Sequence, residues 1–326
     1  MAPLDLLKTR EGLVRTVFMA ALALVPLVAY AASELFYVEF ATRIMIFAIA
    51  AVGLNFILGF GGMVSFGHAA FIGLGAYVVG LAIYYGVYDG FVHLALVVVI
   101  CGLAAFLIGA VCLRTSGLYF IMITLAFAQL LFFVGVGLRQ YGGDDGFTFR
   151  GHSTFATWLD LRNSITFFYV VWGVLAATLF FAYRFVRSRF GMALSGIRSN
   201  EHRMRAIGLP TYRYKLVAFA ISGVICGVAG ALLANLTQFV SPEYMHWTRS
   251  GELLVMVIMG GISSVFGPVL GATLYLVLEE LLSSATEHWQ FLFGPILILV
   301  VLFAKKGLMS ALKIAGLSIG GRAGHG

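Results

Sequence analysis

Polar side chains near the middle of the long apolar stretches of this sequence are few, and none of them is an acid, a lysine or an arginine. They are Asn55, Ser65, His68, Thr124, Gln129 and Ser222, of which the first five are the candidates for a translocation path. Amides, hydroxyls and an imidazole in an apolar setting either hydrogen-bond neighbouring helices or line a path for an uncharged or zwitterionic solute. Both interpretations stay open for each of the five residues. The absence of a series of acids or bases argues against a proton relay or a sodium site.

A second group of reactive side chains lies in the arginine-rich segment RSNEHRMRAIGLP, residues 198–210. Ser199 or Asn200 can cap a helix, and Glu201 in its first turn suits the positive end of the helix dipole. Gly208 and the proline after it would end that helix. The segment therefore predicts a short amphipathic helix that carries Arg205 on its polar side.

One apolar side of this short helix is expected to contain Ile197, Met204 and Ile207, which are spaced by seven and three residues. Such a helix would dock on lipid headgroups or in a groove of a partner protein. A basic anchoring loop is the alternative interpretation.

Charged residues near the ends of apolar stretches give a further expectation. Glu39 and Arg43 are four apart and would pair on one helix, whereas Glu279 and Glu280 lie near the end of another stretch. The sequence contains no GxxxxGK[ST] phosphate loop, nucleophile elbow or HExxH motif. The three cysteines fall in apolar stretches without ligand spacing. We therefore expect no catalysis, no cofactor and no metal site in this chain.

The composition requires these residues to sit in a membrane. Of the 326 residues, 61% are hydrophobic and 11% are charged, compared with roughly 25% charged in soluble domains. Apolar stretches are long enough for nine or ten crossings or part-crossings at ~20 residues each. Because only helices satisfy their own backbone over such stretches in lipid, the sequence predicts an all-α, polytopic membrane helix bundle.

The net charge of +7 is distributed in a way that favours a membrane over nucleic acid. If the N-terminus is cytoplasmic, most lysines and arginines fall on the cytoplasmic side, including eight within residues 184–215 and those of the C-terminus. Both termini are therefore expected in the cytoplasm. This arrangement needs an uncleaved first helix, although its basic start and AYAAS end also resemble a signal peptide.

Two glycine-rich stretches echo each other. GGMVSFGHAAFIGLGAY (61–77) and GGISSVFGPVLGATLY (260–275) each join Gly-Gly, a Ser-containing link and Phe-Gly to an apolar helix. Paired interruptions of this kind predict broken helices near residues 61–67 and 260–268. The predicted breaks are at Gly61, Gly62, Gly67, Gly260, Gly261, Gly267 and Pro268. An internal structural repeat and chance convergence on glycine both explain the echo.

The chain is expected to form one transmembrane domain over residues 1–315. Within it, residues 139–163 are predicted to form an external loop and residues 187–213 a cytoplasmic coupling segment. The glycine-rich residues 316–326 are predicted to be a disordered tail.

Several stretches together resemble the branched-chain amino acid permeases of bacterial ATP-binding-cassette (ABC) importers. They are GLNFILGFGGMVSFGHAAFIGLGAY (53–77), SGLYFIMITLAFAQLLF from Ser116, GGDDGF (142–147), YKLVAFAISGVICGVAGAL (214–232) and the glycine-rich stretch near residue 260. They follow the family's order over most of the chain. The GGDDGF loop suggests the longer of the two paired permease types. Met63 stands where the family commonly has glutamine.

Residues 198–210 resemble the cytoplasmic loop through which such permeases dock on their ATPase. Glu201 and Gly208 match its pattern, whereas His202 and Arg203 replace the usual alanines. The resemblance implies an ATPase-coupling role for Asn200, Glu201, Arg205 and Gly208.

The resemblance also implies a function. The chain would be the permease subunit of an importer of branched-chain or other small amino acids in the bacterial inner membrane. Its partners would be a second permease subunit, two ATPase subunits and a periplasmic substrate-binding protein. A permease for urea or short-chain amides and a stand-alone ion-coupled secondary transporter are the alternatives.

Overall fold

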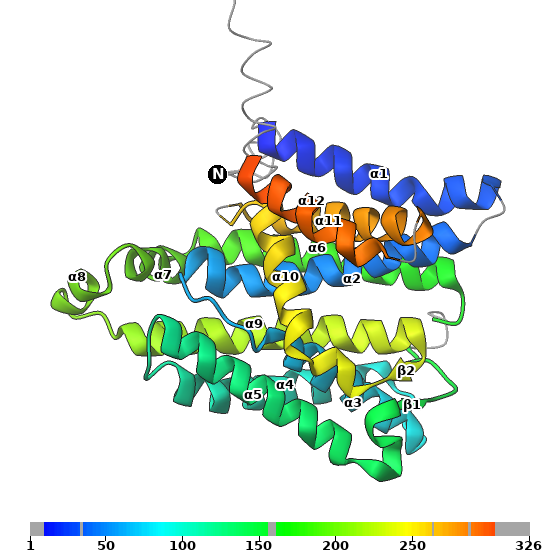
Figure 1. The fold of residues 1–326 in the computed structure, drawn as a ribbon, viewed down its shortest axis with the longest axis horizontal. Helices are drawn as coiled ribbons and strands as arrows, with labels where there is room; N and C mark the ends of the chain where they lie inside the picture. Colours follow the sequence, from blue (N-terminus) through cyan, green and yellow to red (C-terminus); the bar gives the residue numbers. More distant parts are fainter. Residues whose placement is uncertain (1–9, 33–34, 156–160, 263, 286–287, 304–326) are drawn as a thin grey trace, which may run out of the picture.

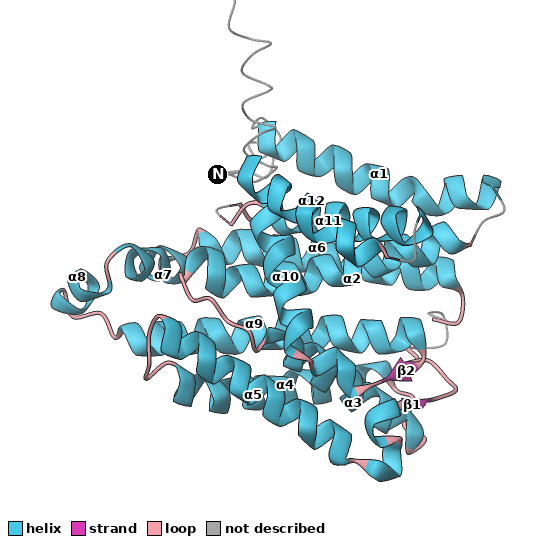
Figure 2. Cartoon of the chain, viewed as in Figure 1, coloured by secondary structure: helices cyan, strands magenta, loops and turns pink. Residues whose placement is uncertain are grey.

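The computed structural model describes residues 10–32, 35–155, 161–262, 264–285 and 288–303. Helices account for nearly all of this part of the chain, which confirms the prediction of an all-α bundle (Figure 2). The predicted tail, residues 316–326, lies outside the described residues.

The membrane-crossing helices can be identified by length and composition. Within the described residues, six helices are long and apolar enough to span a bilayer. They are α2 (Phe36–Asn55) with the π-helical turn η2 (Phe56–Phe60), α4 (Gly90–Cys112), α5 (Leu118–Gly137), α6 (Ser164–Val186), α9 (Thr211–Thr237) and α11 (Gly267–Ala285). The helices that run beside them are α1 (Arg10–Ala32), α3 (His68–Tyr84), α10 (Trp247–Gly260) and α12 (Trp289–Phe303). The chain is therefore a multi-pass membrane protein, and six of the nine or ten predicted crossings or part-crossings are candidate spans within the described residues.

Figure 1 shows two groups of helices that meet along α2 and α9. Helices α1, α6, α11 and α12 lie with α2 on one side, and α3, α4 and α5 lie with α9 on the other. Helix α10 crosses both groups. Helix α2 is buried along most of its length, whereas α4 and α5 expose many large apolar side chains. Those exposed faces suit lipid or another membrane subunit.

The two ends of the bundle differ. At one end lie the short helices α7 (Arg189–Ser199) and α8 (Glu201–Ala206) (Figure 1). At the other end β1 (Phe147–Thr148) pairs antiparallel with β2 (Phe239–Val240). The turns η3 (Arg139–Tyr141), η4 (Gly143–Asp145) and η5 (Pro242–Met245) lie next to these strands in the sequence. The start of α1 and the end of α12 lie towards the α7–α8 end.

Both predicted helix breaks are present. The first separates η2 from α3, and the second separates α10 from α11. The long stretch 252–282 is therefore two helices. The predicted pair between Glu39 and Arg43 is wrong, because Arg43 Nη2 instead lies 3.7 Å from Glu279 Oε1 on α11. Spacing along one helix could not reveal a partner on another.

Close packing through glycine holds the central helices together. A Cβ added at Gly230 on α9 would lie 1.8 Å from the Ile72 carbonyl oxygen on α3, and one at Gly271 on α11 would lie 1.8 Å from the Met256 carbonyl oxygen on α10. Such contacts bring backbones together where no hydrophobic drive acts between helices.

We predict that Gly230→Ala lowers the stability of the chain by ~2 kcal/mol or more, because the added methyl group overlaps the backbone of α3. Gly173→Ala on α6 is the matched control, since nothing lies within 4 Å of its added Cβ. That control should be neutral or slightly stabilising. Melting temperatures in detergent measure both changes, and equal melting temperatures for the two variants would contradict the packing account.

Candidate functional site

The two helix breaks have the same local construction. The second glycine of each Gly-Gly pair has a positive φ, 68° at Gly62 and 111° at Gly261. The serine of each link then accepts a hydrogen bond from the glycine that follows phenylalanine. Ser65 Oγ accepts from Gly67 N at 3.2 Å, and Ser264 Oγ accepts from Gly267 N at 3.2 Å. The echo seen in the sequence is thus an echo in structure.

At the first break, side chains from other helices accept hydrogen bonds from the free backbone N–H groups. Thr124 Oγ1 on α5 accepts from Phe66 N at 3.2 Å, and Ser250 Oγ on α10 accepts from Ala69 N at 3.0 Å. An unpaired N–H in an apolar interior is costly, so these bonds stabilise the interruption.

Asn55 joins the two breaks. Its Nδ2 donates to the Ser264 carbonyl oxygen at 2.9 Å, and a Cβ at Gly59 would lie 2.3 Å from the Ile262 carbonyl oxygen. The end of α2 therefore lies directly against the link between α10 and α11. The two breaks are therefore in direct contact.

His68 is fully buried where α3 begins. Its Nδ1 lies 2.9 Å from Ser65 Oγ, while its Nε2 has no hydrogen-bond partner in the described part of the chain. The rings of Phe71 and Phe219 pack edge-on against the imidazole. This geometry explains the residue by packing, and a role in a translocation path stays a prediction.

The five polar residues do not form one cluster. Asn55, Ser65, His68 and Thr124 all support the breaks. Gln129 lies farther along α5, half-buried, without a hydrogen bond to the described residues. A role for Gln129 in a translocation path stays a prediction.

The coupling segment is two helices rather than one. The backbone of Asn200 is extended (φ −160°, ψ 97°), which ends α7, and Asn200 Oδ1 caps α8 by accepting from Arg203 N at 2.9 Å. The prediction that Ile197, Met204 and Ile207 share one apolar side of a single helix is therefore wrong. Ile197 is buried on α7, whereas Ile207 follows α8 and is 67% exposed.

Gly208 ends α8 as the sequence predicts. With φ at 86° it lets Leu209 N donate to the Met204 carbonyl oxygen at 3.1 Å, while Gly208 N donates to the Arg205 carbonyl oxygen at 2.9 Å. These two bonds form the Schellman arrangement, which favours glycine at its left-handed position.

Glu201 fastens α8 to the start of α9. Its carboxylate accepts from Arg205 Nη2 at 2.6 Å, from Thr211 Oγ1 at 3.1 Å and from Lys215 Nζ. Burial alone would raise the pKa of Glu201. The hydrogen bonds from Lys215, Arg205 and Thr211 lower the pKa by more than burial raises it, so the pKa lies below its ordinary value. The stabilisation from the ionised carboxylate is thus complete above the unfolded-state pKa and is lost as pH falls through the lower folded-state value.

Arg198, at the end of α7, connects this segment to the first break. Its guanidinium donates to the carbonyl oxygen of Gly59 in η2, and its side chain lies over Gly62. A carbonyl freed by the helix interruption thus receives a charged donor from α7.

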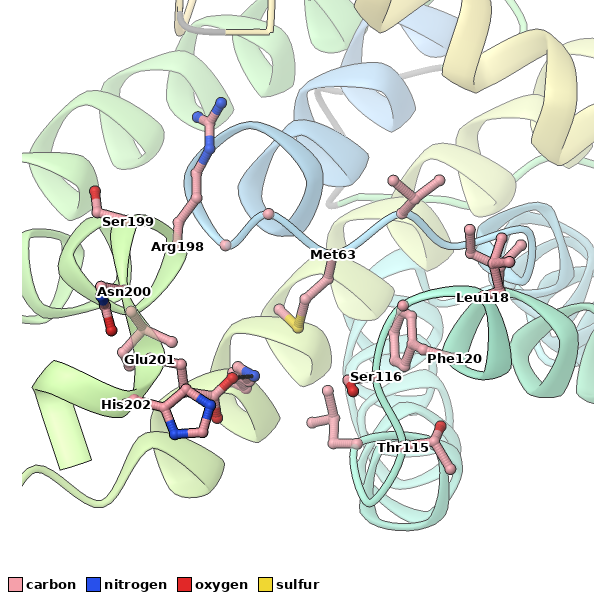
Figure 3. A pocket seen from close by; sticks show the side chains of 18 residues that line it. Met63, Thr115, Ser116, Leu118, Phe120, Arg198, Ser199, Asn200, Glu201 and His202 are labelled. Atoms are coloured by element: carbon pink, nitrogen blue, oxygen red, sulfur yellow. Dashed lines mark hydrogen bonds and ion pairs between the residues drawn. The ribbon is translucent and has the colours of Figure 1, made fainter.

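A cavity of about 620 Å³ lies beside this connection. It is bounded by the first break, by the turn between α4 and α5, and by the junction of α7 and α8 (Figure 3). Met63 projects into it, facing the side of Thr115 and Ser116. Its thioether makes this part of the wall apolar.

Sequence reasoning missed Arg198, Thr211, Lys215 and Ser250 as site residues. Arg198 adjoins a recognised motif, but nothing in the spacing shows that it reaches a carbonyl 139 residues away. For Arg198, the position next to the recognised motif is the one indication in the sequence. No sequence pattern singles out Thr211, Lys215 or Ser250.

The comparisons with known proteins agree with this architecture. A family model described as "Branched-chain amino acid transport system / permease component" matches residues 36–301. The high-affinity branched-chain amino acid transport system permease protein LivM of Salmonella typhimurium is 30% identical over 295 residues, which cover 83% of this chain and 69% of LivM. LivH of Escherichia coli is 25% identical over 285 residues, 81% of this chain and 91% of LivH. No solved structure matches the chain.

The family model spans most of the chain, and the similarity to LivM extends over a comparable length. This multi-pass membrane protein therefore belongs to the family of permease components of branched-chain amino acid transport systems.

Proposed function

We propose that this chain is the membrane-spanning permease subunit of an ATP-driven importer, and that it carries branched-chain or other small amino acids across the bacterial inner membrane. The observation that supports this best is the connection from α8 through α7 and Arg198 to the first helix break, with Glu201 fastening α8 to α9. Such a connection gives a soluble ATPase a means to act on the membrane helices.

The partners follow from the same proposal. Two ATPase subunits would contact α7 and α8, where Asn200, Glu201, Arg205 and Gly208 shape the docking surface. A second permease subunit, expected to be of the LivH type, would cover part of the apolar surface of the bundle. A periplasmic substrate-binding protein would deliver the amino acid at the β1–β2 end.

The proposed cycle requires little chemistry from the chain itself. ATP binding would draw the ATPases together and shift α7 and α8. Because Arg198 holds Gly59 and Asn55 holds Ser264, that shift would reach both breaks and alter the path between them. ATP hydrolysis, on the separate subunits, would reset the arrangement.

We predict that Glu201→Gln reduces ATP-dependent leucine uptake in membrane vesicles at least ~10-fold, because charge-assisted bonds to Lys215 and Arg205 are lost. The chain should still insert, since no crossing helix is changed. Arg184→Gln, exposed in the last turn of α6, is the matched control that also removes one charge, and it should transport normally. Full uptake by Glu201→Gln would contradict the coupling role.

The proposed orientation can be tested by cysteine labelling. The natural cysteines Cys101, Cys112 and Cys226 are buried, so a membrane-impermeant maleimide should report mainly on introduced sites. We expect Met192→Cys on α7 to react in inside-out vesicles, and Asp144→Cys to react in spheroplasts. Reaction of Met192→Cys in intact spheroplasts would reverse the assignment of sides.

A further inference from the structure

A second cavity, of about 200 Å³, lies towards the β1–β2 end of the bundle between α2, α3, α9, η5 and α10. Two arginines, Arg43 and Arg249, line it together with the hydroxyl-bearing side chains of Thr237 and Tyr244. The rest of the wall is apolar and consists of Phe47, Ile72, Leu233 and Leu236. The cavity thus combines positive charge with an aliphatic and aromatic surface.

Arg43 has unused hydrogen-bonding capacity. Its contact with Glu279 Oε1, at 3.7 Å, is longer than a hydrogen bond, and its other described contact is with the Phe47 ring, 6.0 Å from the ring centroid. A guanidinium carries five N–H donors. Charged side chains within membrane helices are costly and commonly mark a functional site.

Arg249, in contrast, is well paired. Its Nη1 donates to both carboxylate oxygens of Glu252, at 3.1 and 3.0 Å, and its Nη2 donates to Glu243 Oε1 at 3.1 Å. Together with Glu279 beside Arg43, three carboxylates surround two guanidiniums. None of these carboxylates is among the residues that line the cavity, so the charged groups that its wall presents are the two arginines.

We propose that this cavity binds one aliphatic α-amino acid in its zwitterionic form. The carboxylate receives N–H donors from Arg43, the ammonium group contacts the hydroxyl oxygens of Thr237 and Tyr244, and the side chain contacts Phe47 and Leu236. The cavity lies below the ~300 Å³ of pockets for drug-sized ligands and suits a solute of amino-acid size. This assignment rests on the proposed import function and adds a defined binding position to it.

The test is equilibrium binding of radiolabelled L-leucine to the full-length chain, purified with its co-expressed partner subunits in lipid nanodiscs and without a binding protein. Arg43→Gln should weaken leucine binding at least ~10-fold through loss of a charged hydrogen bond. Arg139→Gln, on the exposed η3 turn, is the matched control and should bind leucine like the unaltered chain.

A ligand panel separates recognition from damage to the fold. Leucinol lacks the carboxylate, so it should bind weakly, and with the same affinity to the Arg43→Gln variant as to the unaltered chain. Leu236→Trp narrows the cavity and should reduce binding of leucine more than binding of alanine. A general structural defect would instead weaken all these ligands alike.

Unchanged leucine binding by Arg43→Gln, or an equal loss in Arg139→Gln, would overturn the binding site. ATP-dependent leucine uptake by the unaltered complex is measured separately. Normal uptake together with either of those binding results would refute the site and leave the proposed function intact. Binding that depends on Arg43, without ATP-dependent uptake, would refute the import function instead.

Discussion

A helix that is interrupted inside a bilayer leaves backbone N–H and carbonyl groups without their usual partners, and lipid offers none. The rest of this structure depends on how the chain meets that constraint. Thr124 and Ser250 accept hydrogen bonds from N–H groups at the first break, and Arg198 donates to a carbonyl oxygen there. Asn55 donates to a carbonyl oxygen at the second break. The rare polar residues of the bundle are largely accounted for by this requirement.

The hydrogen bonds that satisfy the backbone groups at the breaks come from several helices, so they also connect those helices to the breaks. The donor for Gly59 comes from α7, and α8 is fastened to α9 by Glu201. Because α9 packs backbone to backbone on α3 at Gly230, the segment has little freedom to move alone. Packed helices of this kind respond to force by small rigid displacements rather than by local bending.

The sequence predicts the local features of the site well. Gly-Gly followed by a serine link marks both breaks, and Asn200 and Gly208 mark the limits of α8, because capping and left-handed turns depend on neighbours in the chain. The prediction of a single amphipathic helix was wrong, and the reason is also local. The same Asn200 that caps α8 has an extended backbone, and this places Ile197 on a different helix from Met204.

Contacts between distant segments were beyond sequence reasoning. Spacing suggested Glu39 as the partner of Arg43, whereas the partner is Glu279 on α11. From the sequence, Arg198 and Lys215 are expected only to be members of a basic cytoplasmic patch. Their bonds to Gly59 and Glu201 depend on how α7, α8 and α9 fold together, and one sequence carries no pattern for that arrangement.

Hydrogen–deuterium exchange of the chain in lipid nanodiscs tests the connection between the coupling segment and the first break most directly. Arg198→Ala removes the donor to the Gly59 carbonyl oxygen, and amides within residues 56–67 should then exchange ~10-fold faster. Arg203→Ala, on the exposed side of α8, should leave them unchanged. If residues 56–67 exchange at the same rate in Arg198→Ala as in the unaltered chain, the coupling segment does not hold the break.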